Sequence, residues 1–490
     1  MKHTDIIQKL NLEQKCALLS GETVFTTRAL PGKGIPAITL SDGPNGVRKQ
    51  AGAADHLGLN PSVPATCFPT SSATACSWDE KLGEAVGEAL GEEAAAQEVA
   101  VLLGPGLNIQ RSPLCGRDFE YFSEDPILAG RMAAAYVRGI QKNGISACPK
   151  HFAVNSQELR RMASDSVLDE RTLRELYLTG FEIVVKEAKP KTIMTSYNLI
   201  NGTYANENAH LLQDILRKDW GFDGAVVTDW GGSNDHALGV KNGSTLEMPC
   251  PGGDSIRELM KAVQDGKISE ADVDARLDEM LELVLSTHAA VEKAPRTFDA
   301  AAHHKLARRA AAESIVLLKN EGGILPLKPN EKLAVIGDFA ETPRYQGAGS
   351  SAVNALQVDT LLDCIKADDS GITFVGYASG FERQGAADAE KLEEAVALAK
   401  KADTVLLCLG LDELRESEGL DRADMKLAEN QQQLLAAVAA VNPNVVVLLS
   451  AGAPVETPWV GQCRALVYGA LGGQAGAGAA ADILTGQPCP

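Results

Sequence analysis

The chain has 490 residues, of which 45% are hydrophobic and 23% are charged, as in an ordinary globular protein. That length exceeds what one hydrophobic core usually holds, so we expect two domains. The formal net charge of -19 argues against nucleic acid and anionic membranes as partners, because both are bound through clustered Lys and Arg.

The first part of the chain alternates short apolar runs with alanine-rich amphipathic segments. The apolar runs end in polar or glycine-rich turns and predict strands at 37–40, 99–103, 145–148, 192–196 and 225–228. The amphipathic segments predict helices at 80–98, 169–187, 256–262 and 270–284. This alternation indicates βα units around a parallel sheet.

A second α/β series follows a stretch in which the helical pattern lapses. We expect a first domain over 1–287, a linker over 288–302 and a second domain over 303–490. The second series begins with a predicted helix over 303–319. Buried parallel strands are predicted at 333–337, 372–377, 404–409, 445–450 and 465–468. No Walker lysine pattern or GxGxxG follows any of these strands, which argues against a nucleotide site.

The cysteines indicate a reducing compartment. Ten of them lie singly between Cys16 and Cys489, without a CxxC pair. Cys67, Cys115 and Cys408 lie in apolar or motif-rich surroundings and are expected to be buried thiols. The N-terminus shows no signal peptide, and no run approaches the ~18 apolar residues of a membrane span. These features predict a cytoplasmic protein with no membrane partner.

The strand at 225–228 leads directly into Asp229, Trp230 and a glycine turn. Side chains at the carboxyl end of a buried strand project from a rigid element into a crevice where ligands bind. A carboxylate beside a flat ring suits a sugar, because the ring covers an apolar face and the carboxylate can attack or stabilise a cationic anomeric carbon. The alternative is that Asp229 caps the next helix.

Other strand ends carry further polar and aromatic side chains. They are Asp42, Arg48, Arg117, Lys150, His151 and Tyr197. Each has a structural alternative, such as turn former for Asp42, salt-bridge partner for Arg117, core imidazole for His151 or core aromatic for Tyr197. If the strands are parallel neighbours, however, these side chains converge and provide the donors and acceptors that a polyhydroxylated ring requires.

Together these stretches resemble glycoside hydrolase family 3, and within it the β-glucosidase-type members. The motifs are at 41–44, 116–126, 150–152, 196–198 and 227–231, with a Glu-Gly-x-Asp-Arg segment at 418–422. The resemblance implies an α/β protein with an N-terminal TIM-like (β/α) barrel and an (α/β) sandwich domain whose sheet is mostly parallel. Longer members of the family continue into a fibronectin-like domain, which we expect this chain to lack.

The resemblance also assigns roles to individual residues. Asp229 is implied as the nucleophile, and Glu418 as the acid/base with Glu416 in reserve. The implied sugar contacts are Asp42, Arg48, Arg117, Lys150, His151, Met194, Tyr197, Trp230 and Ser350. The structural alternatives are a solvated charge run around Glu418 and a flexible connector around Ser350. Asp421 and Arg422 are expected to pair and hold the acid/base loop.

These roles imply a retaining, exo-acting β-glucosidase that releases terminal glucose from small β-glucosides or short oligosaccharides. A β-xylosidase or α-L-arabinofuranosidase is an alternative with the same chemistry, and a catalytically weak sugar-binding protein on the same scaffold is another. No metal or cofactor is expected, because there is no HExxH motif and the eight histidines are dispersed. Assembly into a homo-oligomer is left open.

Overall fold

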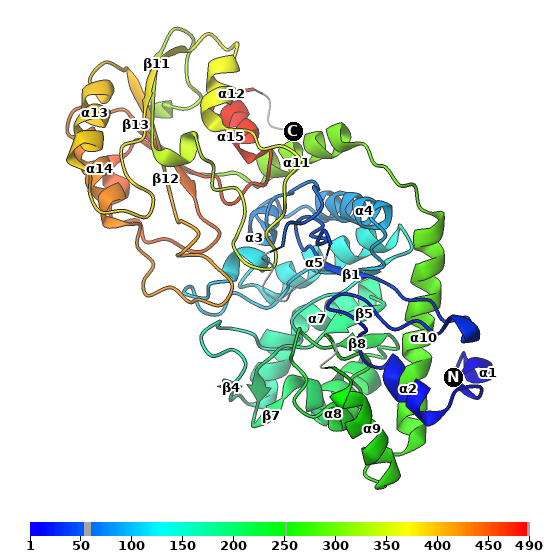
Figure 1. The fold of residues 1–490 in the computed structure, drawn as a ribbon. Coiled ribbons are helices and arrows are strands. Elements are labelled where there is room, and N and C mark those ends of the chain that lie inside the picture. Colours follow the sequence, from blue (N-terminus) through cyan, green and yellow to red (C-terminus); the bar gives the residue numbers. More distant parts are fainter. Residues whose placement is uncertain (53–59, 250–251, 488–490) are drawn as a thin grey trace. The chain divides into compact units, whose positions relative to one another are not determined.

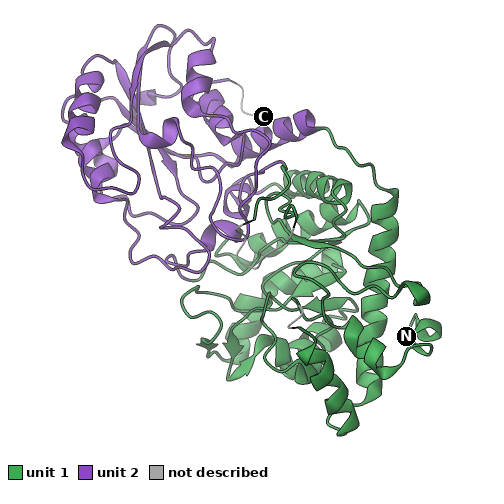
Figure 2. Cartoon of the chain, viewed as in Figure 1, with its two compact units in different colours: residues 1–65, 79–111, 121–299 green, residues 66–78, 112–120, 300–490 purple. Residues whose placement is uncertain are grey.

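The computed structural model describes residues 1–52, 60–249 and 252–487, which fold into two compact units (Figures 1 and 2). Unit 1 comprises residues 1–65, 79–111 and 121–299, and unit 2 comprises 66–78, 112–120 and 300–490. Two early segments of the chain thus belong to the second unit, although the sequence placed them in the first domain. Within the described ranges, no helix is both long enough and apolar enough to span a bilayer.

Unit 1 is built on parallel strands that follow one another along the chain. They are β1 (Leu40–Asp42), β2 (Val101–Leu103), β3 (Ser146–Ala147), β5 (Thr192–Met194) and β8 (Ala225–Val227). β1, β2 and β3 pair in that order, and β5 pairs with β8. The gap between β3 and β5 is bridged by the Met194 amide, which donates to the Pro149 carbonyl at 3.0 Å.

The remaining backbone pairings close these strands into a ring. Val227 pairs with Leu246 in parallel, and the next residue, Glu247, pairs with Ser20 in parallel. A tight turn then brings the chain to Thr26, which pairs antiparallel with Thr39 beside β1. Among the described residues, closing the ring leaves these barrel strands without an unpaired edge. The predicted TIM-like barrel is confirmed, with one antiparallel step that the sequence pattern did not indicate.

The helices of unit 1 follow the strands. The longer ones are α4 (Glu80–Ala96), α5 (Pro126–Gln141), the α6–η4 run (170–188), η6 (His210–Asp219), α8 (His236–Asn242), α9 (Asp254–Gln264) and α10 (Glu270–Lys293). The short helices α1 (Thr4–Ile7) and α2 (Leu12–Leu18) precede β1, and β4 (Asp165–Ser166), β6 (Leu199–Ile200) and β7 (Thr203–Tyr204) form a small separate sheet. α4 and α5 approach closely, since a Cβ at Gly87 would lie 2.4 Å from the Tyr136 carbonyl oxygen.

The predicted linker is shorter in the structure than in the sequence analysis. α10 continues to Lys293 because Thr287 and Val291 remain buried and extend its apolar face. α11 (Ala300–Ser314) begins before the predicted start of the second domain. Only residues 294–299 between these helices lack helical structure.

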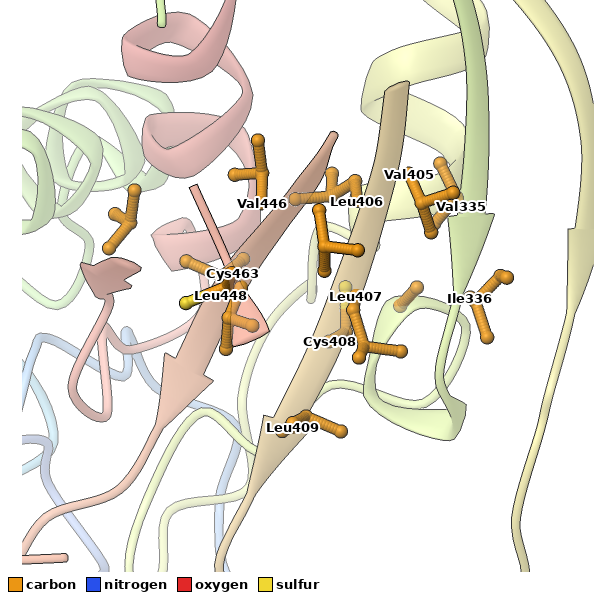
Figure 3. Packing of buried hydrophobic residues seen from close by; sticks show 14 of the residues in the cluster. Val335, Ile336, Val405, Leu406, Leu407, Cys408, Leu409, Val446, Leu448 and Cys463 are labelled. Carbon is orange, nitrogen blue, oxygen red and sulfur yellow. The ribbon is translucent and has the colours of Figure 1, made fainter. Parts of the chain in front are cut away.

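Unit 2 holds a six-stranded sheet in the order β11-β10-β12-β13-β14-β9. The strands are β9 (Val316–Asn320), β10 (Lys332–Ile336), β11 (Thr373–Ala378), β12 (Thr404–Gly410), β13 (Val445–Ser450) and β14 (Ala465–Tyr468), with helices α3 (Ser71–Ala75), α11, α12 (Leu361–Ala367), α13 (Ala389–Ala399), α14 (Glu429–Ala439) and α15 (Gly476–Thr485). Apolar side chains of the central strands, among them Ile336, Leu407 and Leu448, pack on both faces of the sheet (Figure 3). The predicted, mostly parallel α/β sheet is confirmed.

One predicted helix of this unit is partly a strand. The helix expected over 303–319 ends at Ser314, and Val316–Asn320 forms β9 instead. β9 pairs antiparallel with β14, and Val467 lies opposite Leu317. The backbone groups of β14 gain partners from this pairing, which local helix propensity did not reveal.

The strand order brings two long loops to one place. Because β11 lies on one side of β10 and β12 on the other, the chain changes direction between β10 and β12. The loops that follow the carboxyl ends of two such neighbouring strands lie on either side of a crevice in which ligands bind. The β10 loop (337–360) contains Ser350, and the β12 loop (411–428) contains Glu418, so the topology of unit 2 alone brings these two loops together.

Candidate active site

Asp229 stands directly after β8, whose three residues are all buried. The residue is 9% exposed, its Oδ1 accepts a hydrogen bond from the Trp230 amide at 2.8 Å, and its Oδ2 lies 3.7 Å from His151 Nε2. The next helix, α8, is capped by Asp235, whose Oδ1 accepts from the Leu238 amide. Asp229 is therefore not the helix cap, and its carboxylate is held in the barrel beside an imidazole.

The Trp230 side chain is held at both its ring nitrogen and its ring face. Nε1 donates to the Val24 carbonyl at 2.7 Å, and the indole lies 5.2 Å from the Phe25 ring at an interplanar angle of 35°. Phe25 lies on the segment that closes the barrel, and the sequence analysis did not select it. Its signal was a single aromatic residue before β1, which is too weak to stand out.

His151 is oriented by neighbouring amide and phenol groups. Its backbone exchanges two hydrogen bonds with the Asn108 side chain, at 2.8 and 2.9 Å. Its Nδ1 lies 3.1 Å from the Tyr121 hydroxyl, which accepts a hydrogen bond from Asn155 at 2.8 Å. A hydroxyl that donates to Nδ1 leaves the proton of a neutral imidazole on Nε2, facing Asp229.

Tyr197 and Arg161 continue this polar layer. The Tyr197 hydroxyl donates to the Trp230 carbonyl at 2.9 Å, and the Arg161 guanidinium lies 4.9 Å from the centre of the Tyr197 ring. Arg161 also pairs with Glu158 at 2.7 Å. Arg161 was not predicted from the sequence, because it lies in a loop in which several residues are polar.

The remaining predicted barrel residues lie at or beside strand ends. The Asp42 carbonyl accepts the Arg48 amide at 2.8 Å across a turn that contains Gly43, whose φ of +154° disfavours other residues. Lys150 is 2% exposed and Met194 is 1% exposed. A cavity of about 300 Å³ opens beside Arg48 and is also lined by 23–26 and 39–41.

In unit 2, Glu418 is bound to the glycine-rich loop. Its Oε2 accepts the Ser350 amide at 2.7 Å, and its own amide donates to the Ala348 carbonyl at 3.0 Å. The side chain is 16% exposed, and Oε1 lies 3.6 Å from an Arg117 nitrogen. A Cβ at Gly349 would meet the Glu418 Cβ at 2.4 Å, so the two loops pack without spare room.

Arg117 lies in a different place from the one expected. The sequence grouped it with the strand ends of the barrel, whereas the segment 112–120 belongs to unit 2. There the side chain is 1% exposed, pairs with Glu120 at 2.6 Å and borders Glu418. The segment packs with the β12 loop through the Gly116 amide, which donates to Asp421 at 3.1 Å. Packing across this distance in sequence cannot be read from the local pattern.

Glu416, the reserve candidate for the acid/base, is enclosed. It is 1% exposed, and its Oε1 accepts the Gly452 amide at 2.8 Å. Burial raises the pKa of Glu416, while Arg344 and Arg422 oppose that rise. Arg422 donates to the Pro454 carbonyl at 2.6 Å and so helps to hold the loop. The Glu416 carboxylate thus stabilises the loop from within and is not presented at its surface.

Comparison with known proteins agrees with this architecture. Residues 49–283 match the glycosyl hydrolase family 3 N terminal domain, and residues 315–490 match the family 3 C-terminal domain. A beta-glucosidase 3B from Thermotoga neapolitana, solved in complex with alpha-D-glucose, superposes with a TM-score of 0.90 at 33% identity, covering 99% of this chain and 74% of that one. The chain belongs to glycosyl hydrolase family 3.

Two curated relatives within family 3 are also similar over almost the whole chain. A thermostable beta-glucosidase B from Acetivibrio thermocellus is 46% identical over 99% of this chain and 64% of its own length. An exo-alpha-(1->6)-L-arabinopyranosidase from Bifidobacterium longum is 44% identical over 99% of this chain and 65% of its own length. The chain therefore spans just under two thirds of the length of these relatives.

The family 3 residues predicted from the sequence divide between the two units. The barrel group contains Asp42, Arg48, Lys150, His151, Met194, Tyr197, Asp229 and Trp230, and the sandwich group contains Arg117, Ser350 and Glu418. Direct interactions join Asp229 to His151 and Glu418 to both Ser350 and Arg117. Each group holds a carboxylate beside hydrogen-bond donors, which suits glycoside chemistry.

Proposed function

We propose that this protein is a retaining, exo-acting β-glucosidase with Asp229 as nucleophile and Glu418 as acid/base. The observation that carries the proposal is the Asp229 carboxylate after β8, which is fixed through Oδ1 by the Trp230 amide and faces His151 through Oδ2. The similarity to a curated beta-glucosidase and to a glucose-bound structure supports the choice of substrate. Terminal β-D-glucosyl groups of small β-glucosides or short oligosaccharides are the proposed substrates.

The reaction proceeds by two displacements at the anomeric carbon. Asp229 Oδ2 forms a bond to the anomeric carbon while the bond between that carbon and the leaving oxygen breaks. Glu418 gives its proton to the leaving oxygen. Water then attacks the same carbon, Glu418 takes up a water proton, and the ester to Asp229 breaks. Two inversions yield retained stereochemistry. The Trp230 amide holds Oδ1, which leaves Oδ2 to attack.

The choice of Glu418 over Glu416 rests on exposure and partners. A general acid must reach the leaving oxygen, and the Glu418 side chain is 16% exposed, whereas that of Glu416 is 1% exposed. The Gly452 amide donates to Glu416, so this carboxylate already has a structural partner. Glu418 contacts Ser350 and Arg117, which are themselves predicted to touch the sugar.

A pentopyranoside is the second candidate for the sugar. The observation in its favour is the 44% identity to a relative named as an arabinopyranosidase. Arabinopyranose is a six-membered ring that lacks the exocyclic hydroxymethyl group of glucose and carries its C4 hydroxyl in the opposite orientation, whereas xylopyranose differs from glucose only by the missing hydroxymethyl group. Rates on nitrophenyl β-D-glucoside, β-D-xyloside and α-L-arabinopyranoside, compared at equal enzyme concentration, distinguish the candidates.

The catalytic assignment is tested by substitution and by product stereochemistry. Proton NMR of the first product should show the β-anomer of glucose, and Asp229→Asn should abolish turnover while glucose still binds, because the amide keeps the shape but is not a nucleophile. Glu418→Ala should be rescued by azide, while Asp424→Ala, at a half-exposed carboxylate of the same loop, should behave as wild type. An α-anomer product, or azide rescue of Glu416→Ala alone, would refute the assignment.

We also propose that the protein works in the cytoplasm. The eight cysteines in the part of the chain that the structure describes are free thiols. Six of them are buried, where oxidation is hindered, so thiols rather than disulfides are compatible with the fold. Fractionation of the source cells, with activity followed in each fraction, tests this assignment, and activity confined to an extracellular fraction would refute it.

A further inference from the structure

The acid/base candidate sits on a loop with no helix or strand of its own. Residues 411–428 connect β12 to α14 without regular structure. Loops are ordinarily more mobile than the elements they join. A catalytic acid nevertheless has to be held to within about 1 Å, because misplacement by that amount costs about 100-fold in rate. Something in the fold must therefore immobilise this loop.

The buried side chain of Arg344 provides such an anchor. It is 2% exposed and reaches from the β10 loop to the β12 loop. One guanidinium nitrogen donates to the Glu416 carbonyl at 3.1 Å and lies 4.0 Å from Glu416 Oε2. Glu416 in turn accepts the Gly452 amide just beyond β13. The β12 loop is thus tied to the β10 loop and to the end of β13 at one residue.

The anchored residue is only two positions before Glu418. Ser417 pairs in parallel with Ala348, and the Glu418 amide and carboxylate bind Ala348 and Ser350. Arg344 and Ser350 belong to the same β10 loop, so the two loops are joined both before and at Glu418. Releasing the first junction would let the Glu416 carbonyl move and carry Glu418 with it.

We propose that Arg344 is a positioning residue that holds Glu418 in place by binding the backbone and carboxylate of Glu416. The inference rests on the proposed function, because it assigns Arg344 a role only if Glu418 is the acid. Its effect should appear where the leaving group needs a proton. The rate on substrates whose leaving group departs as a stable anion should not depend on Arg344.

The substitution has to remove the anchor without leaving a buried charge unpaired. Arg344→Met alone would strand the Glu416 carboxylate, so the informative variant is Arg344→Met combined with Glu416→Gln, in which the amide oxygen still accepts from Gly452. Glu416→Gln alone is the reference that isolates the arginine. Arg308→Met is the control, because the hydrogen bonds of the Arg308 guanidinium go to Asp482, between α11 and α15. Circular dichroism and the unfolding temperature establish that each variant is folded.

The assay compares kcat/KM for phenyl β-glucoside and dinitrophenyl β-glucoside, since this parameter reports the first displacement. Relative to Glu416→Gln, the double variant should lose about 100-fold on the phenyl substrate and little on the dinitrophenyl substrate. The single variant Arg344→Lys keeps a cation near Glu416, so its loss of rate on the phenyl substrate should be smaller than that of the double variant. Arg308→Met should leave the ratio of the two rates unchanged.

The same assay distinguishes a failure of the role of Arg344 from a failure of the proposed function. If Glu418→Ala changes the ratio of the two rates but the folded double variant does not, Arg344 has no positioning role and the proposed function stands. If Glu418→Ala leaves the ratio as in wild type, Glu418 is not the acid, and the proposed function and the inference fail together.

Discussion

Gly349 offers a direct test of how closely Glu418 is packed. A Cβ at this position would lie 2.4 Å from the Glu418 Cβ and 2.8 Å from its Oε2, whereas ordinary contacts begin at 3.4 Å. Gly349→Ala should therefore push the Glu418 side chain by about 1 Å. The backbone at Gly349 also has a φ of +118°, which alanine rarely adopts.

The two effects have separate magnitudes. A displacement of about 1 Å should lower the rate about 100-fold, which corresponds to about 2.7 kcal/mol in the activation free energy. The backbone strain of a non-glycine residue adds about 1–2 kcal/mol to the folded state, which lowers stability. Only the displacement should depend on the leaving group.

Gly419→Ala is the matched control for this prediction. Gly419 lies in the same loop system with a φ of +86°, but a Cβ there would meet nothing within 4 Å. Both alanine variants should lower the unfolding temperature, while only Gly349→Ala should slow phenyl β-glucoside more than dinitrophenyl β-glucoside. Equal ratios of the two rates in both variants would refute the argument that this contact positions Glu418.

Two further predictions concern stability. Burial, and secondly the charge of Glu416, raises the pKa of Asp118 well above the ordinary value of 3.8. The folded state therefore holds a proton that the unfolded state has lost, and the free energy of unfolding falls as pH rises above that value, by up to about 1.4 kcal/mol per pH unit. Asp118→Asn should flatten this decline in urea-unfolding midpoints at pH values above the ordinary aspartate pKa of about 4, and an unchanged slope would contradict it. Gly87→Ala should destabilise the protein by about 2 kcal/mol, because the added Cβ would overlap the Tyr136 carbonyl of α5. Gly461→Ala is the control, because a Cβ there meets nothing within 4 Å and should change the free energy of unfolding by less than about 0.5 kcal/mol. Similar unfolding midpoints for the two variants would contradict the close approach of α4 and α5.

Much of the candidate site could be predicted because its signals are local. Asp229 and Lys150 each follow a short apolar run, and a run of that kind forms a buried strand whose carboxyl end carries the next side chains. Arg161 was missed because it lies in a loop, where no periodicity singles out one polar residue. Phe25 was missed because its importance comes from stacking on Trp230, a residue distant in sequence.

The sequence by itself determined the two α/β series and the residues that end their strands, since these depend on apolar runs and on residue chemistry within short segments, and the resemblance to family 3 added the two carboxylates as predictions. Only the tertiary structure decided that Val316–Asn320 is a strand, that Arg117 lies beside Glu418 and that Arg344 secures Glu416. The physical reason is that each of these depends on backbone and charged groups whose partners are brought together by folding alone.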